Sequence, residues 1–254
     1  MIKSNVHTEA EIAENVKISS FCTIEKDVKI GEGTWIGPNV SICNGARIGK
    51  NCKIYQGAII SSDPQDLKYD GEKTKTIIKD NTTIREYVTI NKGTKSNIET
   101  IIGSNVLVMA YSHIAHDCII HDNVILVNNS SLSGHVEICE HAIIGGITAI
   151  QQFVKIGPYA YVSGGSLVRK DIPPFIKAAG SPLSYYGVNS IGLSRKKFDN
   201  NKINEINNIY RVMFQSNLNV TQAIKKINKE FKESKEKEVI INFISNSKNG
   251  ILKR

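Results

Sequence analysis

The hydrophobic residues of this chain recur every six positions over its first 170 or so residues. Ile, Val or Leu occupies almost every position from 6 to 168 that is a multiple of six, and only Asp66, Glu72 and Ser96 interrupt the series. An amphipathic helix has a period of about 3.6 residues and a strand a period of 2, so neither explains a sustained period of six. A short fixed period is typical of a solenoid, in which successive coils stack on one another.

A second, smaller inward position follows four residues after each large aliphatic residue. It holds Val, Ala, Ser, Thr or Cys, as at Cys22, Cys52 and Cys118. Alternation along a short strand sends two side chains of every six inward, and three such strands, one from each of three repeats, would close one triangular coil. Residues 18 apart then stack about 4.8 Å from each other. The pattern therefore predicts a mainly β chain, a parallel β-helix of hexapeptide repeats, and it predicts buried thiols rather than disulfides or metal ligands.

Two polar interruptions and a change of period divide the rest of the chain. The segments 61–77 and 91–101 keep the six-residue phase but are polar, and we interpret them as loops that leave the coil. Such loops on a rigid scaffold often carry function. The run Asp171-Ile172-Pro173-Pro174 is expected to end the coil. Helical spacing follows, with Thr221 as one expected helix cap. We predict a coil domain over 1–190 and a small helical domain over 191–254.

Charge is concentrated in the second of these domains. The chain has 254 residues and a net charge of +8. Residues 191–254 contain 14 Lys and Arg against 6 Asp and Glu, which gives 14 − 6 = +8 and leaves the predicted coil domain neutral. Such a basic domain favours an acidic partner. No signal-peptide pattern and no apolar run of about 20 residues is present. We therefore expect a cytoplasmic protein with no membrane span and no nucleic-acid partner.

Five of the six histidines lie within little more than one and a half predicted coils. Polar side chains that point outward are not needed by the core, so a group of them suggests a site. Stacking residues 18 apart gives one outward-facing patch near an edge of the coil, made of His116, Asp117, Gly134, His135 and Gln152, and His113 lies at the corner just before His116.

The residue types in this patch suit acid–base chemistry. Imidazole titrates near neutral pH and a carboxylate can orient it, so His116 beside Asp117 is a candidate general base. Gly134 would stack on His116, where a glycine lets a ligand approach the backbone and offers an N–H to a developing oxyanion.

Two other interpretations compete with this one. His116 and His121 are five residues apart, like two zinc ligands of the gamma-class carbonic anhydrases, which are built on the same kind of coil. The third ligand would fall near Asp80, which supplies no imidazole, whereas a zinc site of that type needs three, so we expect no metal site. The other alternative is a structural or ligand-binding solenoid without catalysis, which does not require a clustered patch.

Short segments along nearly the whole chain form a specific combination. They are Gln65-Asp66-Leu67-Lys68-Tyr69, His113-Ile114-Ala115-His116-Asp117-Cys118, Gly134-His135-Val136, Ile144-Gly145-Gly146, Asp171-Ile172-Pro173-Pro174, Gly187-Val188-Asn189 and Gly192-Leu193. Together they resemble the UDP-N-acetylglucosamine acyltransferases, which begin lipid A synthesis in Gram-negative bacteria. The coil alone would not identify them, because many acyltransferases share it.

The resemblance implies a left-handed coil, a homotrimer with active sites between subunits, and transfer of a 3-hydroxyacyl chain from acyl carrier protein to the 3-hydroxyl of UDP-N-acetylglucosamine. The donor is a phosphopantetheine thioester, so no cofactor is implied. By this resemblance His116 would remove the proton from the attacking hydroxyl, Asp117 would orient His116, and the Gly134 amide would hold the oxyanion. His113 and His135 would position sugar and phosphate groups.

The resemblance also implies contacts to the nucleotide sugar or acyl ligand. These would come from Asp66, Lys68, Gln152, Asn189, Arg195 and Lys196. Gly164 matches a position where side-chain size limits acyl length, and glycine leaves room for a long chain. Two departures stand out. Gln151 replaces a frequent His, which leaves N-acylation of a related UDP-amino sugar as an alternative. Lys196 replaces the second of two arginines, which weakens bidentate phosphate contact.

Overall fold

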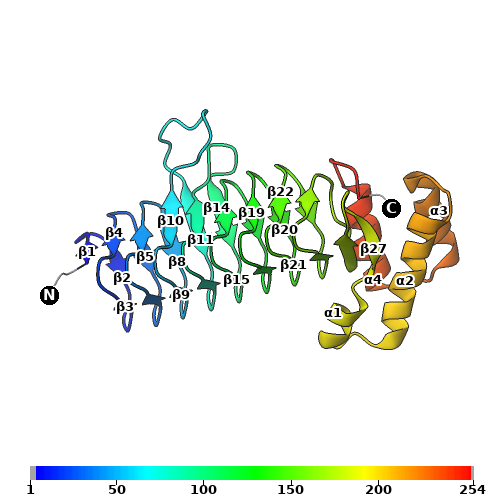
Figure 1. Ribbon diagram of the computed structural model, residues 1–254, viewed down its shortest axis with the longest axis horizontal. Coiled ribbons are helices and arrows are strands. Elements are labelled where there is room, and N and C mark those ends of the chain that lie inside the picture. Colours follow the sequence, from blue (N-terminus) through cyan, green and yellow to red (C-terminus); the bar gives the residue numbers. More distant parts are fainter. Residues whose placement is uncertain (1–3, 253–254) are drawn as a thin grey trace.

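The chain forms a long coil of short strands that ends in a group of helices (Figure 1). A computed structural model describes residues 4–252. The outer ends of the two predicted domains, residues 1–3 and 253–254, lie outside the described residues.

Three sheets form the sides of the coil, and from β1 to β25 each successive strand belongs to the next sheet. All described strand pairs are parallel except that of β26 with β27, which is antiparallel. Sheet A consists of β1 (Asn5–Val6), β4 (Thr23–Ile24), β7 (Ser41–Ile42), β10 (Ile59–Ser62), β13 (Thr89–Asn91), β16 (His113–Ile114), β19 (Ser131–Leu132), β22 (Ala149–Ile150) and β25 (Leu167–Val168). Sheet B consists of β2 (Glu11–Ile12), β5 (Lys29–Ile30), β8 (Ala46–Ile48), β11 (Lys75–Ile78), β14 (Glu99–Ile102), β17 (Ile119–Ile120), β20 (Glu137–Ile138) and β23 (Lys155–Ile156). Sheet C consists of β3 (Lys17–Ile18), β6 (Trp35–Ile36), β9 (Lys53–Ile54), β12 (Thr83–Ile84), β15 (Leu107–Val108), β18 (Ile125–Leu126), β21 (Ile143–Ile144), β24 (Tyr161–Val162), β26 (Ile176–Ala179) and β27 (Ser184–Val188).

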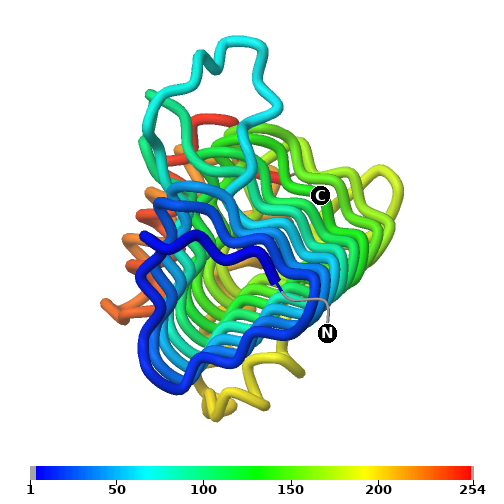
Figure 2. Tube along the Cα trace, turned by 90° about the vertical axis from the view of Figure 1, so that its left-hand side faces the viewer, coloured from blue at the N-terminus to red at the C-terminus, as the bar shows by residue number. Residues whose placement is uncertain are grey.

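The triangular cross-section has three corners, which we call the A–B, B–C and C–A corners after the sheets that they join. Viewed from its N-terminal end in Figure 2, the chain winds anticlockwise as it recedes, so the coil is left-handed. This agrees with the handedness implied by the resemblance. It is opposite to the usual right-handed crossover between parallel strands, so the repeat alone did not predict it.

The interior confirms the six-residue period. The large aliphatic residues from Ile24 onward and the small residues between them are buried, and together they form one continuous core. Cys22, Cys52 and Cys118 occupy the small inward position, as predicted, and Cys139 is also buried. Burial raises the pKa of Cys118 to about 12, so its thiol stays protonated.

Both polar interruptions are loops that protrude from the A–B corner (Figure 1). Where no loop intervenes, the numbers of paired residues differ by 18, as for His113 and Ser131. Ile59 instead pairs with Thr89, and Thr89 with His113, which are differences of 30 and 24. The extra lengths are 30 − 18 = 12 and 24 − 18 = 6, both multiples of six, which keeps the phase. We call 63–74 the first loop and 92–98 the second loop; both are shorter than predicted because the flanking strands extend into the predicted ranges.

The proline pair does not end the coil, so that prediction was wrong. Ile172 still bridges to Ile156, and β26 pairs in parallel with β24. In earlier coils the residue at the position equivalent to Pro173 donates its N–H to the following coil. Gly157, one coil before Pro173, donates in this way to the oxygen of Ile172. No further coil follows in the described part of the chain, so Pro173 forfeits no ladder bond.

Four helices in the described residues pack at the C-terminal end of the coil: α1 (Ser190–Arg195), α2 (Asn200–Gln215), α3 (Val220–Glu230) and α4 (Lys235–Ser245). The cap of α3 is Asn219 in a capping box, not Thr221 as predicted, because its side chain reaches the Gln222 N–H. Tyr210 of α2 is fully buried and donates to the oxygen of Pro174 at 2.7 Å. None of these helices is long and apolar enough to cross a membrane. The division of the chain at residue 190 remains a prediction.

Candidate active site

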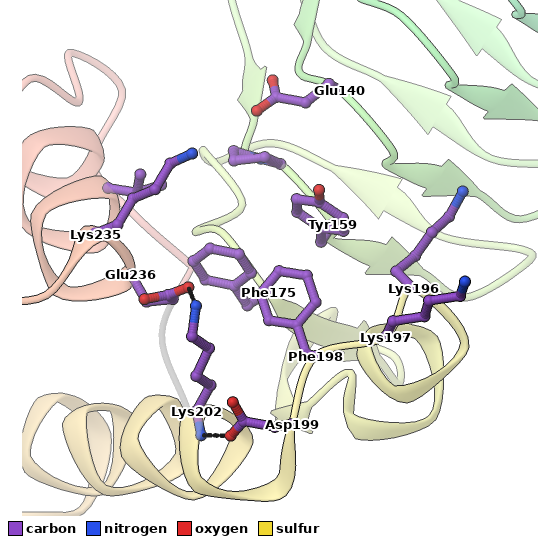
Figure 3. A pocket seen from close by; sticks show the side chains of 12 residues that line it. Glu140, Tyr159, Phe175, Lys196, Lys197, Phe198, Asp199, Lys202, Lys235 and Glu236 are labelled. Carbon is purple, nitrogen blue, oxygen red and sulfur yellow. Dashed lines mark hydrogen bonds and ion pairs between the residues drawn. The ribbon is translucent and has the colours of Figure 1, made fainter.

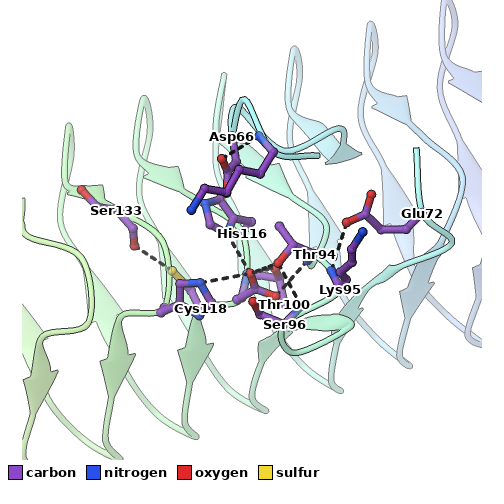
Figure 4. A network of polar contacts seen from close by, with 12 residues as sticks. Asp66, Glu72, Thr94, Lys95, Ser96, Thr100, His116, Cys118 and Ser133 are labelled. Carbon is purple, nitrogen blue, oxygen red and sulfur yellow. Dashed lines mark hydrogen bonds and ion pairs between the residues drawn. The ribbon is translucent and has the colours of Figure 1, made fainter. Parts of the chain in front are cut away.

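The predicted patch lies at the A–B corner beneath the two loops (Figure 4). His116 and Asp117 form the turn between β16 and β17, and Gly134 and His135 form the same turn one coil later. The His135 N–H donates to the oxygen of His116 at 3.0 Å, which fixes the stacking of the two turns.

Asp117 is the most constrained member of the patch. Its side chain is fully buried. One carboxylate oxygen lies 2.7 Å from Nδ1 of His116 and accepts from the Thr94 hydroxyl at 2.7 Å, while the other accepts from the Thr94 N–H at 2.9 Å. Burial alone would raise the pKa of Asp117, but the hydrogen bonds from His116 and Thr94 outweigh it, and the pKa lies below its usual value. The carboxylate is therefore charged and oriented.

His116 has one ring nitrogen committed and one free. Because Asp117 can only accept, the His116 Nδ1 carries the proton, and Nε2 is left as an acceptor with no hydrogen-bond partner among the described residues. The ring lies against Gly134: a Cβ added at that position would be 2.5 Å from Cε1 and 2.7 Å from Nε2 of His116. Only glycine at 134 is compatible with this ring position.

The other two histidines of the patch are held uncharged at neutral pH. Burial lowers the pKa of His113, and the nearby His116 lowers it further; its Nδ1 is 2.7 Å from the Thr89 hydroxyl. Burial also lowers the pKa of His135, an effect that the charge of Asp117 only partly opposes. His135 stacks on Phe153 with ring centroids 4.7 Å apart. Neutral rings of this kind can donate and accept hydrogen bonds to a sugar.

The first loop brings two more predicted residues to this corner. Asp66 is close enough to His135 for its charge to raise the pKa of that ring, and Figure 4 shows it above His116. The N–H of Lys68 donates to the Asp66 carboxylate at 3.0 Å. Gln152 occupies the turn one coil beyond Gly134 and is exposed. The first loop thus lies over the corner that holds His116 and His135.

Four predicted residues lie elsewhere on the same chain. Asn189 is at the B–C corner, where its side chain donates to the oxygen of Tyr159 and caps α1. Arg195 and Lys196 follow at the end of α1, and both are exposed. Gly164 lies at the C–A corner, stacked on Gly146. The predicted contact residues are therefore divided among all three corners.

Sequence reasoning missed two residues that support Asp117. Thr94 belongs to the second loop, and Thr100 in β14 accepts the Asp117 N–H at 2.8 Å. Phe153, the stacking partner of His135, was also not singled out. The second loop interrupts the regular spacing of the coils here, so no periodic signal connects Thr94 with Asp117.

The described residues contain two groups whose atoms are close enough for a metal ion, and neither has a suitable donor set. One is His116, Asp117 and His135, in which the carboxylate is already occupied by three donors. The other is His121, Glu137 and Cys139. Lys155 pairs with Glu137 at 2.9 Å, and burial raises the pKa of Cys139 to about 12, which disfavours a thiolate ligand. His116 and His121 fall in different groups within the described chain.

Comparisons with known proteins agree with the resemblance. A family model described as UDP-N-acetylglucosamine O-acyltransferase, domain 2, matches residues 171–252, and a bacterial transferase hexapeptide model matches 27–62 and 99–134. An acyl-[acyl-carrier-protein]–UDP-N-acetylglucosamine O-acyltransferase of Alkalilimnicola ehrlichii is 39% identical over 195 residues, which cover 76% of each chain.

Solved structures extend the similarity to the whole chain. The UDP-N-acetylglucosamine acyltransferase of Bacteroides fragilis is 42% identical, with a TM-score of 0.98 and full coverage of both chains. That of Francisella novicida is 37% identical with a TM-score of 0.96, and the match covers 100% of this chain and 94% of the other.

Proposed function

Because the chain belongs to the UDP-N-acetylglucosamine O-acyltransferase family, we propose that it transfers a 3-hydroxyacyl chain from acyl carrier protein to the 3-hydroxyl of UDP-N-acetylglucosamine, the first step of lipid A synthesis. The observation that carries the mechanism is His116, oriented by the buried Asp117 at 2.7 Å and packed against Gly134. A cytoplasmic location is part of the same proposal, because both substrates are intracellular.

In the first step, Nε2 of His116 takes the proton of the sugar 3-hydroxyl as its oxygen attacks the thioester carbonyl. Asp117 stabilises the imidazolium that forms. The Gly134 N–H donates to no acceptor within the described residues and is available for the oxyanion. When the C–S bond breaks, the imidazolium returns the proton to the leaving phosphopantetheine sulfur. The site needs no cofactor, because the thioester supplies the activated acyl group.

The basic end of the molecule suits the acidic acyl carrier protein. Between the B–C corner and the helices lies a cavity with an aromatic floor and a lysine rim (Figure 3). Its lysines are Lys196, Lys197, Lys202 and Lys235, and of these Lys202 pairs with Glu236 at 3.1 Å. We infer that the carrier protein approaches from this end, where its acidic surface meets the largest excess of positive charge.

A homotrimer completes the proposal, because one chain cannot gather residues from three corners into a single site. The outward face of sheet A supports an interface: from β13 to β25 its strands present Thr89, His113, Ser131, Ala149 and Leu167, whereas every strand of sheet B except β17 presents a Glu, Lys or Arg side chain. Along the adjoining C–A corner, Tyr111 and Ile147 are 59% and 73% exposed in the single chain. An uncharged face beside exposed apolar residues is typical of a subunit interface. Sedimentation equilibrium should give three times the chain mass of 28.1 kDa, and a monomer would contradict this part of the proposal.

His116→Ala is the direct test of the mechanism. The variant should lose acyl transfer by about 10²- to 10⁴-fold, the usual contribution of a general base, while it keeps its oligomeric state. His121→Ala is the matched control, since His121 lies five residues later on the outside of sheet B, in contact with Glu137, and should leave turnover unchanged. The measurement is transfer of labelled acyl chains from acyl carrier protein to UDP-N-acetylglucosamine. Near-normal turnover by His116→Ala would rule out this mechanism.

A further inference from the structure

The second loop supplies Thr94, which contacts Asp117 of the His116–Asp117 pair although the loop lies outside the repeat. Thr94 donates its hydroxyl to one oxygen of Asp117 at 2.7 Å and its backbone N–H to the other at 2.9 Å. The oxygen that accepts from the hydroxyl is also the one that faces Nδ1 of His116. Two donors on the two carboxylate oxygens fix both the plane of the carboxylate and its distance from the ring.

The loop that carries Thr94 is closed tightly by its own backbone. The oxygen of Thr94 accepts from the Ile98 N–H at 2.7 Å. A Cβ at Gly93 would be 2.5 Å from the backbone of Ile98 and Glu99, so a larger residue there would force the loop open. Thr94 itself is buried. Its position is therefore set by the fold and not by a mobile surface segment.

The second loop is also joined to the first, which carries Asp66 and Lys68. Lys92 pairs with Asp63 at 2.7 Å, and Lys92 is only 12% exposed. The Lys95 N–H donates to Glu72 at 3.1 Å, and Asn91 donates to the oxygen of Asp63 at 2.9 Å. These contacts connect the first loop, which is proposed to bind the sugar, to the second loop, whose Thr94 holds Asp117.

We propose that Thr94 is a positioning residue of the acyl-transfer reaction, the outer member of a chain in which its hydroxyl holds Asp117 and Asp117 holds His116. The inference rests on the proposed function. Thr94 touches no substrate; it acts by keeping the carboxylate charged and aligned, so that Nε2 of His116 points to the acceptor hydroxyl. His116 and His135 are the other titratable groups that face the carboxylate.

Thr94→Val removes only the hydroxyl and retains the backbone N–H that donates to Asp117. We expect kcat to fall about 10- to 100-fold, the effect of losing a hydrogen bond to a charged group, with the KM for UDP-N-acetylglucosamine within about twofold of wild type, because no substrate contact is lost. The low-pH limb of kcat should move to higher pH, because a carboxylate that has lost one donor stabilises the protonated ring of His116 more strongly and so keeps the base protonated up to a higher pH. Thr94→Ser restores the hydroxyl and should restore both kcat and the position of its low-pH limb.

Thr34→Val is the matched control. Thr34 is also buried, and its hydroxyl makes hydrogen bonds of 2.9 and 3.0 Å with the backbone at Gly49 and Cys52, in the N-terminal coils. It should lower the melting temperature and leave kcat and its pH profile unchanged. A purely structural role for Thr94 would give Thr94→Val the same behaviour.

The outcomes separate this inference from the proposed function. An active wild type with an unchanged kcat and pH limb in Thr94→Val would overturn the positioning role alone. A wild type that transfers no acyl chain to UDP-N-acetylglucosamine would overturn the proposed function and this inference with it. If Thr94→Val does not fold, Thr94→Ala carries the same prediction, because it also lacks the hydroxyl.

Discussion

The contact between Gly134 and His116 gives the sharpest prediction about the site. The backbone of Gly134 is outside the left-handed region, so alanine there adds no torsional strain. Its Cβ would, however, lie 2.5 Å from Cε1 of His116, against about 3.4 Å for an ordinary contact. The ring must therefore move by about 3.4 − 2.5 = 0.9 Å. A misplacement of about 1 Å costs on the order of 10²-fold in rate, so Gly134→Ala should lower kcat by about that factor.

The same clash should cost stability, and a second substitution isolates it. Forcing one extra methyl into a packed site costs about 1–3 kcal/mol, which for a chain of this length lowers the melting temperature by about 2–4 °C for each kcal/mol. In a His116→Ala background the ring is absent, so Gly134→Ala should then be nearly neutral. The assay is a double-mutant cycle by thermal denaturation, combined with acyl-transfer kinetics of the single Gly134→Ala variant. Unchanged kcat, or an equal loss of stability in both backgrounds, would refute the reasoning.

Two further predictions concern pH and chain length. The folded-state pKa of His113 is lowered, so its contribution to stability is present above its unfolded pKa of about 6.5 and is lost as the pH falls through the folded value. His113→Gln should therefore make the melting temperature depend less on pH between pH 7 and pH 5. The same slope of melting temperature against pH in both proteins would contradict this. A Cβ at Gly164 would be 3.0 Å from the oxygen of Gly146 and would project from an exposed position. Gly164→Leu should therefore shift the preferred acyl chain to a shorter length in a mixture of acyl carrier protein thioesters. An unchanged product distribution would argue against Gly164 as the residue that limits acyl length.

The six-residue period was sufficient to predict the coil because each repeat places its side chains by the same geometry. It correctly predicted buried thiols at Cys22, Cys52 and Cys118. It failed where the chain leaves the repeat. Pro173 was expected to end the coil, but a proline is harmless where no following coil needs its N–H. The cap of α3 was assigned to Thr221, although Asn219 is equally suited by residue type, and only the observed hydrogen bonds distinguish them.

The residues of the candidate site also fall into those whose position the repeat predicts and those whose position it does not. The stacking of Gly134 on His116 follows from adding 18, because no insertion separates those coils. Thr94 and Asp117 are separated by the end of the second loop and by the three strands β14, β15 and β16, and a sequence pattern does not define how an irregular loop closes. The placement of Asn189 was also beyond the repeat, whereas that of Gly164, 18 residues after Gly146, follows from it. The resemblance assigned Asn189 and Gly164 to the ligand without showing that they lie at different corners of one chain.

The corner itself explains why the coil can hold such a site. The third residue after each large aliphatic lies in the left-handed region in most coils, and asparagine or glycine often fills it. Asp117 and His135 occupy this same position, with φ of 60° and 59°. Short polar side chains tolerate that conformation better than most residues do. Ladder bonds on both sides of the turn, such as that from Ala115 to Leu132 at 3.1 Å, keep it from relaxing. The functional groups therefore replace corner residues that the repeat needs anyway, so the coil supplies a rigid site without a change in its backbone.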